Sequence, residues 1–279
     1  MSDTASISGT IGIIAGESDL PRLMAERFRD LGQAYHIITF QGIDVPWAAE
    51  HPWTEVEFVR AGPLFKSLKA HGCTDLVFVG GMARPPVSLA RADLTFLGIA
   101  PKLLASLGKG DDQTLRAVLE VFESRGFRIR PAFEVMPELL PSEGVLGQVK
   151  PSKRDTSDAA RAAEIVGKLG EADVGQAAIV ASGVCLGVET IGGTDHMLNA
   201  LGQLPERLQR EGGVLYKAPK LGQDRRIDFP AIGPDTVRNA AAAGLTGVVI
   251  EAGGVMVVSR DEAVALADQL GVFLWAREP

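Results

Sequence analysis

The chain is poor in the residues that build disulfide and zinc frameworks. Its 279 residues include two cysteines and four histidines. The cysteines, Cys73 and Cys185, lie far apart, and each stands within an apolar run. This argues against a disulfide framework and against a zinc site rich in cysteine. We interpret both cysteines as small buried apolar residues.

Long apolar runs and an excess of positive charge are also absent. No uninterrupted apolar stretch approaches the length of a membrane span, and the short run from Ile11 to Ala15 leads into a glycine turn without a signal-peptide pattern. The net charge is −7 and the pI about 5.2. Because binding to a polyanion needs a basic face, we expect no nucleic-acid partner. We expect a cytoplasmic protein.

The composition is that of a folded protein, with 46% hydrophobic and 23% charged residues. In the first half, apolar runs that predict strands alternate with helical patterns, which is typical of an α/β fold with a parallel sheet. The strands are expected at residues 11–15, 34–40, 56–59, 76–79 and 127–130, and the helices at 20–31, 63–71 and 111–124. We therefore predict a Rossmann-like N-terminal domain over residues 1–135.

Residues 136–145 contain two prolines and a glycine without periodicity, which predicts a linker. Beyond it, residues 146–279 read as an α+β domain, and we expect this C-terminal domain to be catalytic. Helices are expected at 155–169, 234–243 and 260–270, and strands at 177–181, 185–190, 214–218, 247–251 and 255–258. The first two strands predict a hairpin, and so do the last two, which Ala252-Gly-Gly254 joins.

The segment from Lys217 to Thr236 is the most informative part of the chain. It combines cations with carboxylates and turn residues: Lys217, Lys220, Arg225 and Arg226 with Asp224 and Asp228, and with Gly222 and prolines. Cations can bind phosphate, and carboxylates can hold a divalent metal or a water, so this composition favours phosphate chemistry. Taken alone, the cluster is also compatible with a surface loop of solvated ion pairs.

Further carboxylates stand where predicted strands end. Glu189 and Glu251 each end a strand, and Thr194 and Asp195 begin a helix, so these groups can converge on one point. An N-cap role is an equally good interpretation of Asp195. His196 has no second histidine at metal-ligand spacing and is interpreted as structural.

Two glycine-rich loops follow strands in the first half. Gly12-Ile-Ile-Ala-Gly16 precedes a helix, where backbone N–H groups can bind phosphate. Gly80-Gly81 ends another strand, and Arg84 follows it as an anion contact. The full dinucleotide fingerprint is missing, so redox chemistry is poorly supported. A tight turn that needs glycine for steric reasons is an equal alternative for the first loop.

Together these segments resemble the LpxI family of UDP-2,3-diacylglucosamine pyrophosphatases. The resemblance extends over nearly the whole chain. It rests on residues 12–16 with 20–21, 80–85, 110–112, 143–147, 173–177, 189 with 193–195, 217–220 with 223–225, 228, 230, 232–234 and 251–254. Glu17-Ser18 and Ala83 depart from the pattern expected of the family.

The resemblance implies a Rossmann-like N-terminal domain, a family-specific C-terminal domain and a role in lipid A biosynthesis. The enzyme would use Mg²⁺, with Mn²⁺ as a substitute, to hydrolyse UDP-2,3-diacylglucosamine to 2,3-diacylglucosamine 1-phosphate (lipid X) and UMP. It would work peripherally at the inner-membrane surface, and a homodimer is left open. The implied catalytic residues are Asp224, Arg225, Lys217 and Lys220. The implied substrate-binding residues are Gly12, Gly16, Gly80, Gly81, Arg84, Gln176, Thr194 and Gln223. The implied metal ligands are Asp224, Asp228, Asp195, Glu189 and Glu251.

Two other classes of protein remain as alternatives. A non-catalytic protein that binds a nucleotide sugar or a lipid phosphate would need the same cations but would show no turnover. A Rossmann-type oxidoreductase would have to retain a nicotinamide cofactor.

Overall fold

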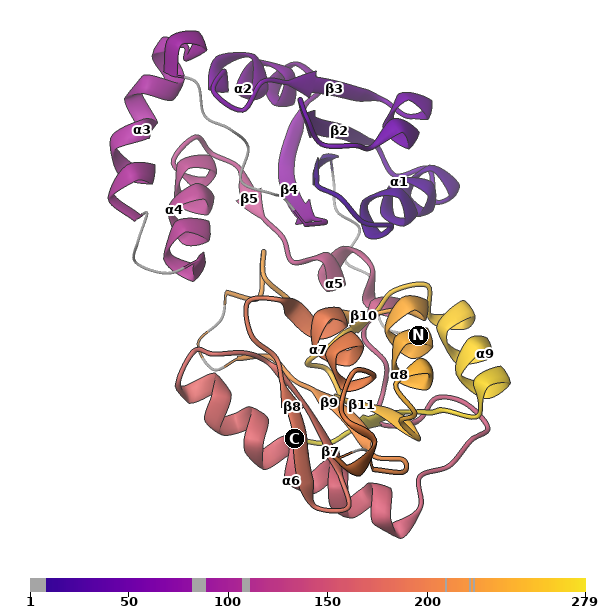
Figure 1. Ribbon diagram of the computed structural model, residues 1–279. Coiled ribbons are helices and arrows are strands. Elements are labelled where there is room, and N and C mark those ends of the chain that lie inside the picture. The colour runs from indigo at the N-terminus through magenta and orange to yellow at the C-terminus, as the bar shows by residue number, and fades with distance from the viewer. Residues whose placement is uncertain (1–8, 82–88, 107–110, 209, 221, 223) are drawn as a thin grey trace. The chain divides into compact units, whose positions relative to one another are not determined.

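The computed structural model describes residues 9–81, 89–106, 111–208, 210–220, 222 and 224–279. The chain forms two compact units (Figure 1). Unit 1 contains Met1–Pro137 together with Asp224–Asp228, and unit 2 contains Glu138–Gln223 and Phe229–Pro279. The division after Pro137 falls inside the predicted linker. Each unit is described by itself.

Unit 1 is built on a five-stranded parallel sheet of order β3-β2-β1-β4-β5. The strands are β1 (Thr10–Ala15), β2 (Tyr35–Phe40), β3 (Trp53–Val56), β4 (Cys73–Val79) and β5 (Arg128–Ile129). The helices are α1 (Leu20–Asp30), α2 (Ala61–Ala70), α3 (Leu94–Ser106), α4 (Asp111–Glu123) and α5 (Ala132–Val135), with short 3-10 turns at Pro46–Glu50 and Leu89–Arg91. A further 3-10 turn, Pro137–Leu139, begins at the last residue of the first segment of unit 1 and continues into unit 2. The predicted parallel α/β sheet is confirmed.

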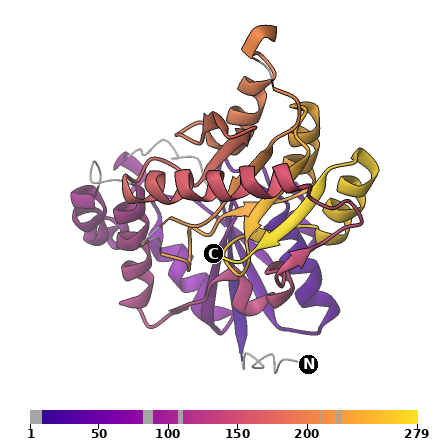
Figure 2. The ribbon, with the colours of Figure 1, turned by 90° about the horizontal axis from the view of Figure 1, so that it is seen from below.

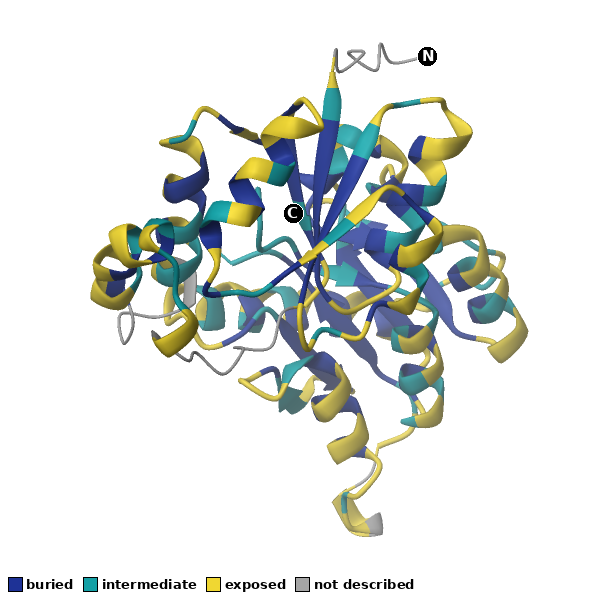
Figure 3. Ribbon diagram, turned by 90° about the horizontal axis from the view of Figure 1, so that it is seen from above, coloured by how far each residue is buried: buried dark blue, intermediate teal, exposed yellow. Residues whose placement is uncertain are grey.

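Helices cover both faces of this sheet. Buried side chains of α2, α3 and α4, among them Leu68, Phe96 and Phe122, pack on one face. Helix α1 packs on β1 and β2. Because side chains alternate along a strand, the residues of β1 that face α1 lie between those that face α2 on the other side of the sheet. Figure 3 shows the central strands mostly in dark blue and the outward turns of the helices in yellow. Such a doubly wound sheet places its ligand-binding edge at the carboxyl ends of the strands.

Unit 2 contains a six-stranded mixed sheet of order β6-β13-β11-β9-β7-β8. The strands are β6 (Gly144–Val145), β7 (Ala177–Ala181), β8 (Val184–Val188), β9 (Val214–Lys217), β11 (Gly247–Glu251) and β13 (Phe273–Arg277). A separate pair is formed by β10 (Ala231–Ile232) and β12 (Met256–Val257). Strands β9, β11 and β13 are parallel, and β6, β7 and β8 are antiparallel to their neighbours.

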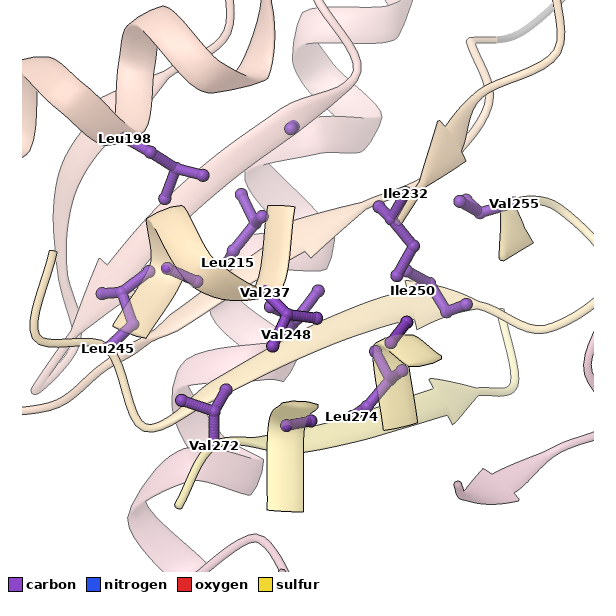
Figure 4. Close-up of a cluster of buried hydrophobic side chains, with 14 of the residues drawn as sticks. Leu198, Leu215, Ile232, Val237, Leu245, Val248, Ile250, Val255, Val272 and Leu274 are labelled. Carbon is purple, nitrogen blue, oxygen red and sulfur yellow. The ribbon is translucent and has the colours of Figure 1, made fainter. Parts of the chain in front are cut away.

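Helices also cover both faces of the sheet in unit 2. They are α6 (Lys153–Glu171), α7 (Gly193–Leu201), α8 (Pro234–Ala242) and α9 (Arg260–Leu270), with a 3-10 turn at Glu206–Leu208. Helix α6 lies along one face (Figure 2), where Ala159, Ala162 and Val166 join a buried cluster with strand residues. Buried residues of α7, α8 and α9 pack on the other face, where Leu198 and Val237 lie beside Leu215 and Val248 (Figure 4).

The predicted hairpin of residues 247–251 and 255–258 is wrong. Strand β11 pairs with β9 on one side and β13 on the other, so both of its hydrogen-bonding edges are occupied. Strand β12 therefore pairs with β10. The other predicted hairpin is present as β7 and β8.

Three smaller features of the structure also differ from what the sequence indicated. The third strand of unit 1 occupies Trp53–Val56 and not 56–59. Helix α3 was not predicted, because Gly98 and Pro101 lie inside it and both residue types are unfavourable in a helix interior. Cys73 is buried as predicted, but Cys185 is exposed because it lies on β8, at the edge of its sheet. Among the described residues, no helix is long and apolar enough to cross a membrane.

Candidate active site

Several of the predicted site residues lie along one edge of the sheet in unit 2. Strands β8, β9, β11 and β13 run in the same direction, because β8 and β9 are both antiparallel to β7. Their carboxyl ends therefore share an edge, which holds Glu189 directly after β8, Lys217 at the end of β9 and Glu251 at the end of β11. Gln176 joins them because β7 begins there. This is the edge at which sheets with parallel strands bind ligands.

Glu189, Thr194 and Lys217 form a buried polar cluster at this edge. The Lys217 Nζ donates to Thr194 Oγ1 at 2.8 Å and lies 3.8 Å from Glu189 Oε2. The Thr194 hydroxyl in turn donates to Glu189 Oε2. The side chains of Lys217 and Glu189 are only 10% and 8% exposed. Burial of both charges is tolerated because they are paired and the hydroxyl joins them.

The start of helix α7 brings Thr194 to this cluster. The helix begins at Gly193, and its N-cap is Gly192, so the N-cap interpretation of Asp195 is wrong. Asp195 lies in the first turn, where its negative charge suits the helix dipole. Its Oδ1 accepts a hydrogen bond of 2.9 Å from Asn239 Nδ2 on α8.

Gln176 lies against Glu189 and has an unsatisfied side-chain oxygen. Its backbone N–H donates to Glu189 Oε1 at 3.4 Å. Its Oε1 is buried without a hydrogen-bond partner, and an acceptor in this state is costly unless a bound group donates to it. Gly175 is required here, because a Cβ atom would lie 2.1 Å from the Glu189 carbonyl oxygen.

Glu251 points away from the buried cluster. Lys217 is paired in register with Ile250, which faces the cluster of α7, α8 and α9. Side chains alternate along a strand, so Glu251 leaves the sheet on the face of α6. Its carboxylate lies close to Gly254, where a Cβ atom would come within 2.5 Å of Oε1.

Lys220 follows β9 and binds Asp173. The Lys220 Nζ lies 2.8 Å from Asp173 Oδ1. Asp173 has a left-handed backbone, with φ of 53°, in the turn between α6 and β7. It therefore brings an acidic group beside one of the predicted catalytic lysines.

Asp224–Asp228 is a short helical turn that belongs to unit 1. The N–H of Asp228 donates to the Asp224 carbonyl at 3.2 Å, and Ile227 packs against the core of unit 1. We predicted this segment as part of the C-terminal domain. Its contacts group it with unit 1 because Ile227 is apolar and Arg226 pairs with Glu123 on α4.

Asp224 is held by Arg226 through both carboxylate oxygens. Arg226 donates from Nε to Oδ1 at 2.9 Å and from Nη2 to Oδ2 at 2.7 Å. The backbone N–H of Arg226 adds a third bond, to Oδ1, at 3.1 Å. These hydrogen bonds from Arg226 lower the pKa of Asp224 despite its partial burial, and the charge of Arg116 on α4 contributes. Asp224 is therefore an ionised acceptor at neutral pH.

The other two charged residues of the turn flank this pair. Arg225 is exposed, whereas Asp228 is partly buried. Both make further polar or electrostatic interactions.

Three of the four predicted glycines of unit 1, Gly12, Gly16 and Gly80, have clear packing roles. Gly12 lies inside β1, where a Cβ atom would come within 2.5 Å of Leu76. At the ends of β1 and β4, a Cβ on Gly16 would lie 2.2 Å from the Gly81 carbonyl oxygen, and Gly80 needs its φ of +89°. The N–H of Gly16 donates to Val79 O at 2.8 Å. Glu17 and Gly81 exchange two bonds of 2.7 Å. Close backbone packing therefore accounts for Gly16 and Gly80, and the N–H groups of Gly16 and Gly81 are already paired.

Two predicted residues are not described, and the predicted metal ligands do not all belong to one unit. Arg84 and Gln223 lie outside the described residues. The five predicted metal ligands divide between the units: Asp224 and Asp228 belong to unit 1, and Glu189, Asp195 and Glu251 to unit 2. Across the part of the chain that the structure describes, no group of three or more His, Cys, Asp or Glu side chains is placed to hold a metal ion.

Sequence reasoning assigned no site role to four residues at these clusters: Asp173, Arg116, Glu123 and Arg226. Arg226 was named only as one of the cations of the segment that contains Asp224. Glu123 lies 103 residues from Arg226, so no local pattern could have paired them.

These features define an α/β protein in which a Rossmann-like parallel sheet and a mixed sheet occur in one chain. The mixed sheet carries paired charges at its strand ends. Residues 10–139 match the model of the LpxI N-terminal domain, and residues 142–275 match that of the LpxI C-terminal domain. The chain is also 39% identical over 273 residues to the UDP-2,3-diacylglucosamine pyrophosphatase LpxI of Caulobacter vibrioides. The aligned residues cover 96% of this chain and 98% of that protein. The chain belongs to the LpxI family, so the resemblance seen in the sequence is confirmed.

Replacing Thr194 with valine tests the buried cluster. The Thr194→Val variant keeps the shape but leaves Glu189 and Lys217 without their bridging hydroxyl. We expect the free energy of unfolding in urea to fall by about 1–3 kcal/mol, the cost of leaving buried polar groups unsatisfied. Thr190→Val, an exposed site four residues earlier, should stay within about 0.5 kcal/mol of wild type. Equal stability of the two variants would contradict the bridging role.

Proposed function

We propose that this protein hydrolyses the pyrophosphate of UDP-2,3-diacylglucosamine to 2,3-diacylglucosamine 1-phosphate and UMP, in lipid A biosynthesis. The observation that carries the proposal is the 39% identity, over nearly the full length of both chains, to a Caulobacter vibrioides protein named for this activity. The charged strand ends of unit 2 and the Asp224 turn support it, since they supply the groups that a pyrophosphate requires.

The reaction needs a water aimed at phosphorus and donors for the oxygens that gain charge. The water oxygen bonds to one phosphorus as the bond from that phosphorus to the bridging oxygen breaks. The bonding electrons leave with the other phosphate, and the water loses a proton. We assign Lys217, Lys220 and Arg225 as donors to phosphate oxygens. Gln176 Oε1, a buried acceptor without a partner, is suited to accept a hydrogen bond from the substrate.

Asp224 is assigned to the attacking water or to the metal. Its lowered pKa keeps it ionised, so it can accept a hydrogen bond from water or bind a cation. The same property makes it a weak base for complete proton removal. Its role would therefore be orientation and charge stabilisation, which usually contribute most to this kind of reaction.

A divalent cation, Mg²⁺ or Mn²⁺, is the proposed cofactor. Asp224 and Asp228 lie one helical turn apart, with the N–H of Asp228 on the carbonyl of Asp224. Mg²⁺ is usually bound through one or two carboxylates together with phosphate oxygens and waters, so this pair fits. When bound, the cation would neutralise charge on the pyrophosphate oxygens. Glu189, Asp195 and Glu251 remain predicted ligands.

The proposed substrate carries two acyl chains and would be held in a membrane. We therefore propose that the protein acts peripherally at the inner-membrane surface. Flotation with phospholipid vesicles that contain the substrate tests this, and failure to float would contradict it.

The activity is tested by incubating the purified full chain with UDP-2,3-diacylglucosamine in ¹⁸O-labelled water. We expect equal amounts of UMP and the sugar 1-phosphate by mass spectrometry, with one ¹⁸O atom in one of the two products. The labelled product identifies the phosphorus that water attacks. Binding of the substrate without turnover would favour the alternative of a non-catalytic binding protein.

Asp224→Asn tests the central carboxylate. The variant keeps the size of the side chain but loses its charge, and we expect kcat to fall by on the order of 10²-fold or more. Circular dichroism should show an unchanged fold. Asp235→Asn is a matched control, because Asp235 is an exposed residue of α8 and should keep wild-type turnover. Near-normal kcat in Asp224→Asn would remove this residue from the mechanism.

Metal removal tests the cofactor. Excess EDTA should abolish turnover, and addition of Mg²⁺ or Mn²⁺ should restore it, because a cation held mainly by oxygen exchanges readily. Full activity in excess chelator would exclude a required divalent ion.

A further inference from the structure

The guanidinium of Arg226 contacts a second carboxylate besides that of Asp224. This carboxylate belongs to Glu123 on helix α4, which lies 103 residues earlier in the sequence. The Nε and Nη2 of Arg226 bind Asp224, while Nη1, on the other side of the guanidinium, donates to Glu123 Oε1. The planar guanidinium is thus held by a carboxylate at each of two edges. Lysine could not replace this arrangement, since its ammonium group is a point charge without a fixed fork.

Glu123 is fixed to the body of unit 1. It is the last residue of α4, whose Leu119 and Phe122 are buried in the core of the unit. Ile227, next to Arg226, packs against the same core. The ion pair and the apolar contact therefore attach the Asp224 turn to a rigid helix at two neighbouring points.

We propose that Glu123 is a positioning residue for Asp224 and acts through Arg226. The proposal rests on the catalytic role of Asp224 proposed above. Both contacts with Arg226 are needed to define the direction of the Asp224 carboxylate. The local pair fixes the carboxylate relative to the guanidinium, and Glu123 fixes the guanidinium relative to α4. Because small misplacements of a catalytic group are costly in rate, loss of Glu123 lowers turnover without removing any group that touches the substrate.

Stability separates this role from a merely structural one. The side chains of Arg226 and Glu123 are 36% and 39% exposed, and ion pairs with this exposure contribute little to folding. Removal of Glu123 should therefore lower kcat and leave the unfolding temperature nearly unchanged. KM should also stay nearly constant, because Glu123 binds no substrate.

The test compares Glu123→Ala with Glu120→Ala in the full chain. Glu120 lies on the same helix and forms an exposed pair with Lys102, so it is a matched control. We expect kcat for UDP-2,3-diacylglucosamine to fall about 10-fold in Glu123→Ala, with KM within about twofold. Glu120→Ala should match wild type. Glu123→Gln, whose amide oxygen can still accept from Arg226, should recover part of the loss.

A double-mutant cycle shows whether the effect passes through Arg226. Arg226→Lys alone should lower kcat at least as much as Glu123→Ala, and the double variant should be no worse than Arg226→Lys. Wild-type kcat in Glu123→Ala, or losses that multiply in the double variant, would overturn the positioning role. If wild type itself gives no UMP, the proposed function fails instead, so the two failures are distinguishable.

Discussion

The candidate site in unit 2 depends on one buried interaction, in which Lys217 is paired with Glu189 through the hydroxyl of Thr194. An unpaired charge at this depth would be costly. The pairing therefore requires β9, the residue after β8 and the first turn of α7 to meet at one point. Because these strands run in the same direction, the same edge also carries Glu251. A charged sheet edge is the result, with its backbone fixed by the strands behind it.

A second constraint acts on the Asp224 turn. The charges within the turn satisfy one another locally, since Arg226 binds Asp224 two residues away. An isolated pair of this kind would leave the turn free to move as a unit. The contacts of Ile227 with the apolar core and of Arg226 with Glu123 attach it to unit 1. These two contacts hold the turn, and with it Asp224, against unit 1.

The fold of unit 1 was largely predictable, because alternating strands and helices produce a parallel sheet with few alternatives. Unit 2 was less predictable. Local turn chemistry at Ala252-Gly-Gly254 indicated a hairpin, whereas β9 and β13 already occupy both edges of β11. Gly16 was interpreted as a phosphate contact or part of a tight turn, and Gly80 as a substrate contact. The close approach of Gly16 to Gly80 and Gly81, visible only in three dimensions, accounts for Gly16 and Gly80 by packing.

The sequence by itself determined the family, the order of most elements and the chemical types at the site, because motifs and hydrophobic periodicity are local properties. It also placed Lys217 and Glu189 at strand ends. Only the tertiary structure decided which groups pair. It buried Lys217 with Glu189, directed Glu251 to the opposite face of the sheet, and joined Arg226 to Glu123 across 103 residues. Such pairings follow from strand order and from the face on which each side chain emerges. The local sequence pattern specifies neither the strand order nor the face of the sheet on which these side chains lie.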